Sequence, residues 1–138
     1  MINIQKEMEN LFGHSCYCYS LAYLLSETTD IKTLTKLVLN GWYEGFVDND
    51  GYISKPVQYY NSIVRELASG QRSIRDVEKP EISSLSELPD DENHVVEYQY
   101  GNQSHFVVAN KNGVVFDPYG NSNTVSKGKP VSWRKYIF

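Results

Sequence analysis

The first half of the chain carries apolar residues at spacings of three and four, the period of an amphipathic helix. Gly13 is suited to end a first helix, while Ser15 and Asp30 are suited to cap the N-termini of a second and a third. Gly41 lies just beyond the third helix, and Pro56 suits the first turn of a fourth. The predicted helices span residues 3–12, 16–26, 31–39 and 56–69.

The second half changes to short runs of β-branched and aromatic residues separated by turn residues, a pattern typical of strands. The predicted strands span residues 94–100, 104–110 and 114–117, with a last strand near Tyr136. Residues 42–55 and 71–92 show little periodicity, apart from one short turn over 83–88. Because helices come first and strands follow, we predict a single α+β domain over residues 1–138, with N-terminal helices packed on a C-terminal antiparallel sheet.

The composition narrows the class of protein. A length of 138 residues with 41% hydrophobic and 22% charged residues is typical of one globular domain. The formal net charge of −4 argues against nucleic acid as a partner, because duplex-binding proteins usually carry a basic face. The N-terminal sequence lacks the basic and apolar regions of a secretory signal, and no apolar run approaches the ~20 residues that span a bilayer. We therefore expect a cytoplasmic protein without a membrane partner.

Two cysteines, Cys16 and Cys18, are the candidate nucleophiles. A thiol attacks as the thiolate, which the N-terminus of a helix favours, and Cys16 begins a predicted helix. Cys18 lies in line with Leu21, Ala22 and Leu25, the stripe expected to face the core. Two residues of helix rotate Cys16 by about 200° from that stripe. We therefore expect Cys16 to be the nucleophile and Cys18 to be a small buried apolar residue.

His105 and Asp117 lie in a predicted hairpin, where the turn decides whether they share a face. A two-residue turn at 112–113 directs Asp117 away from His105. A three-residue loop at 111–113 pairs Asp117 with Val107 and makes the two side chains diagonal neighbours. A site that uses both residues requires the three-residue loop, which is therefore the prediction.

These residues together predict a site for thiol hydrolysis. His105 would take the proton from Cys16, while Asp117 would fix the orientation and tautomer of the imidazole. The anionic tetrahedral intermediate needs hydrogen-bond donors, and the backbone N–H of Cys16 is one of them. The second donor is expected upstream, with Asn10 as the first candidate and Gln5 and His14 in reserve.

Other interpretations of the same residues remain open. A metal site would draw on His14, Cys16, Cys18 and His105, but Cys-x-Cys is shorter than the usual spacing of thiolate ligands. We therefore expect no metal and no cofactor. His105 can also be a strand histidine bonded to backbone carbonyls, and Asp117 followed by proline can simply open a turn.

The stretch from Cys16 to Ser20 and on into Leu-Ala resembles the nucleophile helix of papain-like peptidases of the bacteriocin-processing type. Residues 105–108 and 115–118 resemble the histidine strand and the Asp-Pro turn of the same group. The resemblance implies a papain-like fold and a Cys-His-Asp triad. Asn10 stands where that group usually has glutamine, which is a departure from its pattern.

A wider resemblance is to a phage-associated family known as domain of unknown function 261. It implies a papain-like fold and a prophage or mobile-element setting, and it implies no established activity. The residues that carry it are Cys16 and Tyr17, Gly41 and Trp42, Val47 and Asp48, Pro56, residues 105–108, Asp117 and Pro118, residues 122–125, and Ile137 and Phe138.

Three functions follow from this sequence. The first is a cysteine hydrolase that cuts an amide bond in a peptide or in peptidoglycan, in a phage or prophage setting where release occurs by lysis or in a particle. The second is a noncatalytic phage structural or host-interaction protein with a degenerate thiol site. The third is an acyl transferase of the transglutaminase type, which uses the same order of Cys, His and Asp in usually longer domains.

Overall fold

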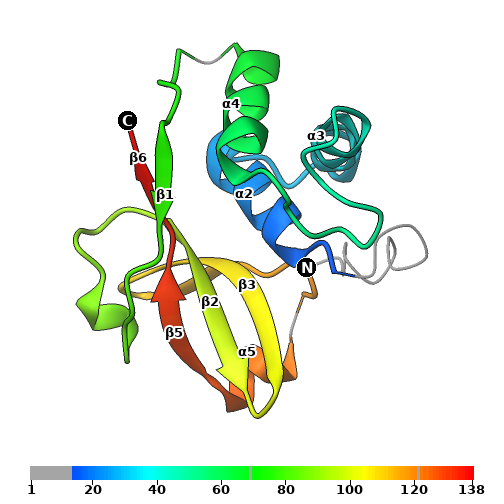
Figure 1. Ribbon diagram of the computed structural model, residues 1–138. Helices are drawn as coiled ribbons and strands as arrows, with labels where there is room; N and C mark the ends of the chain where they lie inside the picture. Colours follow the sequence, from blue (N-terminus) through cyan, green and yellow to red (C-terminus); the bar gives the residue numbers. More distant parts are fainter. Residues whose placement is uncertain (1–13, 69, 121) are drawn as a thin grey trace.

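The computed structural model describes residues 14–68, 70–120 and 122–138, and it has the predicted α+β architecture (Figure 1). The predicted helix at 3–12 and Gly13 lie outside the described residues. The first group of elements is helical: α2 (Cys16–Ser26), α3 (Ile31–Tyr43) and α4 (Pro56–Leu67). The elements that follow are β1 (Asp76–Glu78), η1 (Leu85–Glu87), β2 (His94–Tyr100), β3 (Gln103–Asn110), β4 (Gly113–Phe116), α5 (Asn123–Lys127), β5 (Lys129–Trp133) and β6 (Lys135–Ile137).

α2, α3 and α4 begin where predicted, and the differences lie at the Ser15 cap, at Gly41 and at the end of α4, which stops at Leu67 and not at the predicted residue 69. Asp30 caps α3 by accepting a hydrogen bond from the backbone N–H of Thr33 at 3.2 Å, and Pro56 lies in the first turn of α4. Ser15 precedes α2 as predicted but makes no capping hydrogen bond. Its φ of −100° and ψ of 12° depart from the extended conformation that capping residues adopt, so the predicted cap is wrong.

Gly41 does not end α3, which continues to Tyr43. A Cβ atom on Gly41 would lie 2.5 Å from Cε1 of Tyr59, whose side chain is completely buried. The glycine therefore allows α3 and α4 to pack closely, and the prediction that it marks the helix end is wrong.

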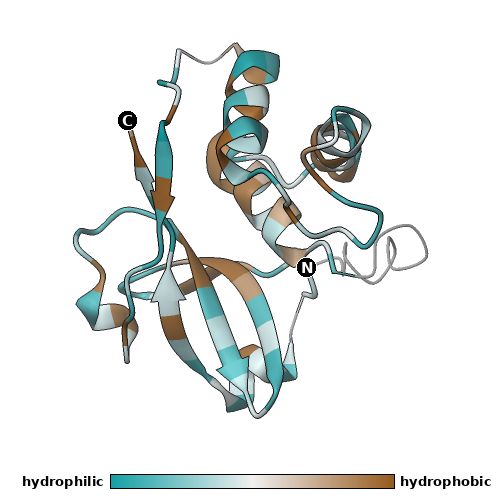
Figure 2. Ribbon diagram, viewed as in Figure 1, coloured by the Kyte–Doolittle hydropathy of each residue, from teal (hydrophilic) through white to brown (hydrophobic). Residues whose placement is uncertain are grey.

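The sheet has the strand order β4-β3-β2-β5 and is antiparallel, while β1 and β6 form a separate antiparallel pair. One face of the four-stranded sheet packs against α2, and α2 also packs against α3 and α4. Figure 2 shows apolar residues concentrated along α2, which lies next to the sheet (Figure 1). Val95 and Val108 pack on this face, whereas Val96 and Val107 pack on the other. Both faces are covered, which explains the consecutive valines in β2 and β3.

The turn between β3 and β4 differs from both predicted turns. Asn110 pairs with Gly113, so the turn contains residues 111–112 alone. The register then shifts by one residue, and Val108 pairs with Phe116. A two-residue turn followed by a bulge thus gives the same register beyond the bulge as the predicted three-residue loop. The prediction of a three-residue loop is therefore wrong. The register that this loop predicted for the two strands is nevertheless present, because Val108 pairs with Phe116.

Within the described residues, no helix combines the length and the apolar character needed to cross a bilayer.

Candidate functional site

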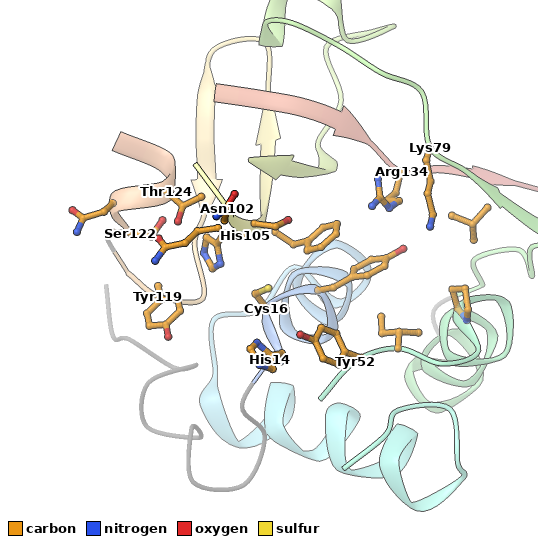
Figure 3. A pocket seen from close by; sticks show the side chains of 18 of the residues that line it. His14, Cys16, Tyr52, Lys79, Asn102, His105, Tyr119, Ser122, Thr124 and Arg134 are labelled. Atoms are coloured by element: carbon orange, nitrogen blue, oxygen red, sulfur yellow. The ribbon is translucent and has the colours of Figure 1, made fainter. Parts of the chain in front are cut away.

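A pocket of about 1150 Å³ lies where the N-terminus of α2 meets β3 (Figure 3). Cys16 and His105 both line it, and Figure 3 shows their side chains next to each other near its middle. The two residues are separated by most of the chain and belong to a helix and a strand that pack together. The structure thus brings together the cysteine and the histidine that the sequence singled out.

The two cysteines occupy different environments, as predicted. Cys16 is the first residue of α2 and is partly exposed, and the first N–H groups of a helix have no acceptor within that helix. Cys18 is completely buried, and its Sγ donates to the backbone oxygen of Gly51 at 3.1 Å. Burial, together with the nearby Cys16 and Asp48, raises the pKa of the Cys18 thiol well above its ordinary value. The thiol that reaches the pocket is therefore that of Cys16.

His105 and Asp117 form a buried hydrogen bond, with 2.6 Å between Nε2 and Oδ1. A carboxylate accepts, so Nε2 carries a proton in this bond, and Nδ1 is the ring nitrogen that can exchange a proton with another group. Burial lowers the pKa of His105, but hydrogen bonds and charge interactions with Asp117 and Cys16 outweigh it and raise this pKa to about 9. At neutral pH the ring is therefore mostly an imidazolium between a carboxylate and a thiol.

Asp117 is held by groups that follow it in the chain. Its Oδ1 accepts from the backbone N–H of Tyr119 at 2.8 Å, and its Oδ2 accepts from the N–H and hydroxyl of Ser122 at 3.2 and 3.0 Å. Burial raises the pKa of Asp117, but the hydrogen bonds from His105, Tyr119 and Ser122 together with the charge of His105 lower it below its usual value. The carboxylate is therefore ionised and fixed in orientation.

Ser122 is a site residue that the sequence interpretation missed. Its Oγ also accepts from the N–H of Val125 at 3.3 Å and thereby caps α5. The signal was a serine followed by polar residues, a common helix start, but the five-residue helix behind it has little periodicity. Capping and the contact with Asp117 together tie α5 to the site.

A hydrogen bond joins α2, which carries Cys16, to β3, which carries His105. The hydroxyl of Ser20, a fully buried residue, donates to the backbone oxygen of Phe106 at 3.0 Å. β4 pairs with β3 only as far as Val108, which leaves the preceding part of β3 at the edge of the sheet and open to this contact. Ser20 is one helical turn from Cys16, and Phe106 follows His105, so the bond fixes the spacing of the pair.

The predicted second oxyanion donor, Asn10, and its reserve Gln5 lie outside the described residues. His14, the other reserve, is exposed and lines the pocket, where its ring stacks on Tyr52 with centroids 4.8 Å apart. Asn102 lines the same pocket from the turn between β2 and β3 and had no role in the sequence interpretation (Figure 3).

The four residues considered as metal ligands do not form a metal-binding cluster. Among the described residues, no group of three or more His, Cys, Asp or Glu side chains is arranged to hold a metal ion. Cys18 in particular points to the carbonyl of Gly51, inside the protein. The donor set around Cys16 is that of a thiol, an imidazole and a carboxylate.

Similarity to known proteins exists at the level of a protein family. No curated protein and no solved structure matches the chain. A family model described as "Protein of unknown function, DUF261" matches residues 2–138, a range that includes every residue of the site described above. The chain therefore belongs to the DUF261 family.

Proposed function

We propose that the protein is a cysteine hydrolase that cleaves an amide bond in a peptide or in peptidoglycan. The observation that carries the proposal is the buried His105–Asp117 hydrogen bond in the same open pocket as the thiol of Cys16. A helix that begins with a cysteine and packs on an antiparallel sheet bearing the histidine also supports a papain-like relationship. The phage or prophage setting is part of the same proposal and is supported by the resemblance of the sequence.

The proposed reaction begins with the imidazolium of His105 beside the thiol of Cys16. An imidazolium next to a thiol favours the thiolate, which attacks the carbonyl carbon of the substrate and forms a C–S bond. The oxyanion develops near the backbone N–H of Cys16 at the start of α2. His105 then gives its proton to the leaving nitrogen as the C–N bond breaks.

The second half of the reaction uses the same groups in reverse. His105, now neutral, takes a proton from water, and the hydroxide formed attacks the thioester carbon. The C–S bond breaks, the acid product leaves and the thiolate and imidazolium are restored. Asp117 keeps the ring in one orientation throughout and stabilises its charged form, which the raised pKa of His105 reflects.

The noncatalytic alternative predicts a different pocket. A degenerate site would be expected to have its cleft filled by side chains, whereas this pocket has a volume of about 1150 Å³ beside Cys16. Tyr19 is buried in the core, and Tyr17 stacks on Phe106 in the pocket wall. The open cleft therefore favours hydrolysis over a purely structural role.

The test compares hydrolysis by the unaltered protein and by Cys16→Ala, with Cys18→Ala as the matched control. The substrates are a diverse peptide mixture and a muropeptide mixture, and the products are identified by mass spectrometry. We expect cleavage by the unaltered protein and by Cys18→Ala, and none by Cys16→Ala. Hydrolysis that persists in Cys16→Ala, or that is absent from the unaltered protein on both mixtures, would contradict the proposal.

A further inference from the structure

The pocket extends from the thiol to a buried cation. Arg134 directly follows β5, lines the same pocket as Cys16 and is 5% exposed. Its guanidinium carbon lies 4.9 Å from the ring centroid of Phe106 and 5.8 Å from that of Tyr17, and these two rings stack on each other. Each ring belongs to the residue that directly follows a member of the Cys-His pair. The cation therefore lies one aromatic side chain beyond that pair, at one end of the pocket (Figure 3).

Arg134 is paired with one carboxylate, but its hydrogen bonding is incomplete. Nη1 donates to the hydroxyl of Ser132 at 2.9 Å, and Nη2 lies 3.4 Å from Oε1 of Glu97. That carboxylate also accepts hydrogen bonds from the hydroxyls of Ser104 and Ser132. The buried Nε of Arg134 has no hydrogen-bond partner in the part of the chain that the structure describes. A buried guanidinium in this state is costly, and an anion on its pocket side would offset part of the cost.

A second cation lies at the same end of the pocket. Lys79 is exposed and forms no ion pair with any described residue. Asp76 is the carboxylate that faces this part of the pocket, and its Oδ1 accepts from the backbone N–H of Val77 at 2.8 Å. Among the described residues that line this end of the pocket, Arg134 and Lys79 are cations and Asp76 is a carboxylate, while Glu97, which pairs with Arg134, lies outside the lining. Lys79 is therefore the cation at this end that has no carboxylate paired with it among the described residues.

The two ends of the pocket differ in chemistry. On the far side of Cys16 from Arg134 and Lys79, Figure 3 shows neutral polar side chains, among them Asn102 and Thr124. A charge preference is therefore expected on one side of the reacting bond alone. Cationic ends of clefts also raise the local concentration of anionic ligands.

We propose that the substrate of the Cys16 site carries a carboxylate on the side of the scissile amide that faces Arg134 and Lys79. The inference rests on the proposed hydrolase function and narrows its substrate class to acidic peptides. The stacked rings of Tyr17 and Phe106 supply an apolar surface for the substrate between the bond that is cut and the carboxylate. A glutamate or aspartate side chain and a terminal carboxylate present the same chemistry to the two cations.

The test measures kcat/KM of the full chain on peptides matched in pairs. In one set, glutamate or glutamine occupies each position in turn on both sides of the scissile bond, and both ends are blocked. In a second set without glutamate, the C-terminus is either free or amidated. We expect about a tenfold preference for the charged member of a pair on one side of the bond alone, the size of a hydrogen bond to a charged group. A preference in the first set identifies a side-chain carboxylate, and a preference in the second identifies the C-terminal carboxylate.

Substitutions of Lys79 and Arg134, with Lys32 as the control, test whether these two cations cause the preference. Lys79→Gln removes an exposed charge, and we expect it to reduce the preference to about threefold. Lys32→Gln removes an exposed charge on α3, away from the pocket, and we expect it to leave the preference unchanged. Arg134→Gln should abolish the preference, and its fold is checked by circular dichroism because the residue is buried.

A chemical probe keeps this inference separate from the hydrolase proposal. Iodoacetate and iodoacetamide alkylate the same thiol, but only iodoacetate is an anion. The rate with iodoacetate divided by the rate with iodoacetamide at Cys16 therefore reports the local charge without any hydrolysis. We expect the ratio to fall in Lys79→Gln and to stay constant in Lys32→Gln. A shifted ratio without hydrolysis of any peptide would contradict the hydrolase and leave the anion site standing. Hydrolysis with no charge preference, or equal ratios in both variants, would overturn the inference.

Discussion

The hydroxyl of Ser20 lies 3.0 Å from the backbone oxygen of Phe106, and this hydrogen bond joins α2 to β3 directly beside the reacting pair. Neither residue carries a reacting atom. The bond nevertheless determines how the thiol meets the imidazole, because Cys16 is one helical turn before Ser20 and His105 is adjacent to Phe106. Ser20 is therefore a positioning residue in the proposed mechanism.

Replacing Ser20 with alanine should lower kcat by about tenfold and leave KM nearly unchanged, because the change misaligns the pair without touching the rest of the pocket. The unpaired carbonyl of Phe106 should also cost about 1–3 kcal/mol of unfolding free energy. Steady-state kinetics and urea denaturation measure the two effects.

The matched control for Ser20→Ala is Ser62→Ala. The hydroxyl of Ser62 donates to the backbone oxygen of Tyr59 within α4, so its loss removes a hydrogen bond but no connection between elements. A loss of kcat in Ser62→Ala as large as that in Ser20→Ala would show that the effect is general destabilisation and not positioning.

Asp117→Asn should move the alkaline limb of the rate profile to lower pH. The limb reflects loss of the proton from His105, whose pKa is raised to about 9 in part by the carboxylate of Asp117. Without that charge the imidazolium is less stable, so activity should decline at a lower pH than in the unaltered protein. The profile of kcat/KM between pH 5 and 10 measures the shift, and an unchanged limb would contradict the assigned role of Asp117.

The same interactions predict how stability depends on pH. The pKa of His105 is raised from 6.5 to about 9 in the folded protein, so its stabilisation is complete below pH 6.5 and is lost as the pH rises through about 9. The lost free energy is on the order of 3 kcal/mol. Unfolding free energies measured at intervals from pH 6 to 9.5 should therefore fall for the unaltered protein and vary much less for His105→Gln. Parallel curves for the two proteins would contradict the raised pKa.

Gly41→Ala should destabilise the fold by about 1–3 kcal/mol, the usual cost of overpacking a core. The added Cβ would lie 2.5 Å from the ring of Tyr59, which is buried and whose hydroxyl donates to the backbone oxygen of Cys18 at 3.2 Å. Thermal and urea denaturation measure the change, and Asn40→Ala in the same helix serves as the control. Equal stability of Gly41→Ala and the unaltered protein would show that α3 and α4 separate without cost.

The elements that the sequence predicted well are those with strong local signals. α2 and β2 have the predicted bounds because apolar spacing and turn residues mark both of their ends. Three elements were not predicted: β1, β5 and α5. β1 has three residues and α5 has five, which is too short for a clear pattern, and β5 contains Pro130. Their conformations depend on distant partners, such as β2 for β5 and β6 for β1.

The hairpin shows the same division between local and distant causes. Asn112 and Gly113 are strong turn formers, yet the turn lies one residue earlier and a bulge restores the register. Burial of Val108 and Phe116 together on the face toward α2 explains this, because a slip by one residue would place the two side chains on opposite faces of the sheet. Turn composition alone could not reveal that requirement.

Only part of the candidate site could be identified from the sequence. Cys16, His105 and Asp117 are residue types that a thiol mechanism needs, and the structure brings the three together. Ser122 and Arg134 are equally close to the pocket but were missed. Their positions depend on α5 and on the junction of β5 with β6, the elements with the weakest local signals.

The most direct test of the account is the rate at which iodoacetamide alkylates Cys16 at pH 6, with intact and peptide mass spectrometry to locate the label. An imidazolium-paired thiol should react at least about tenfold faster than a free cysteine in an unstructured peptide at this pH. We expect this advantage in the unaltered protein and in Cys18→Ala, and we expect it to be lost in His105→Gln. A rate equal to that of the peptide, or one that does not change in His105→Gln, would contradict the claim that His105 activates Cys16.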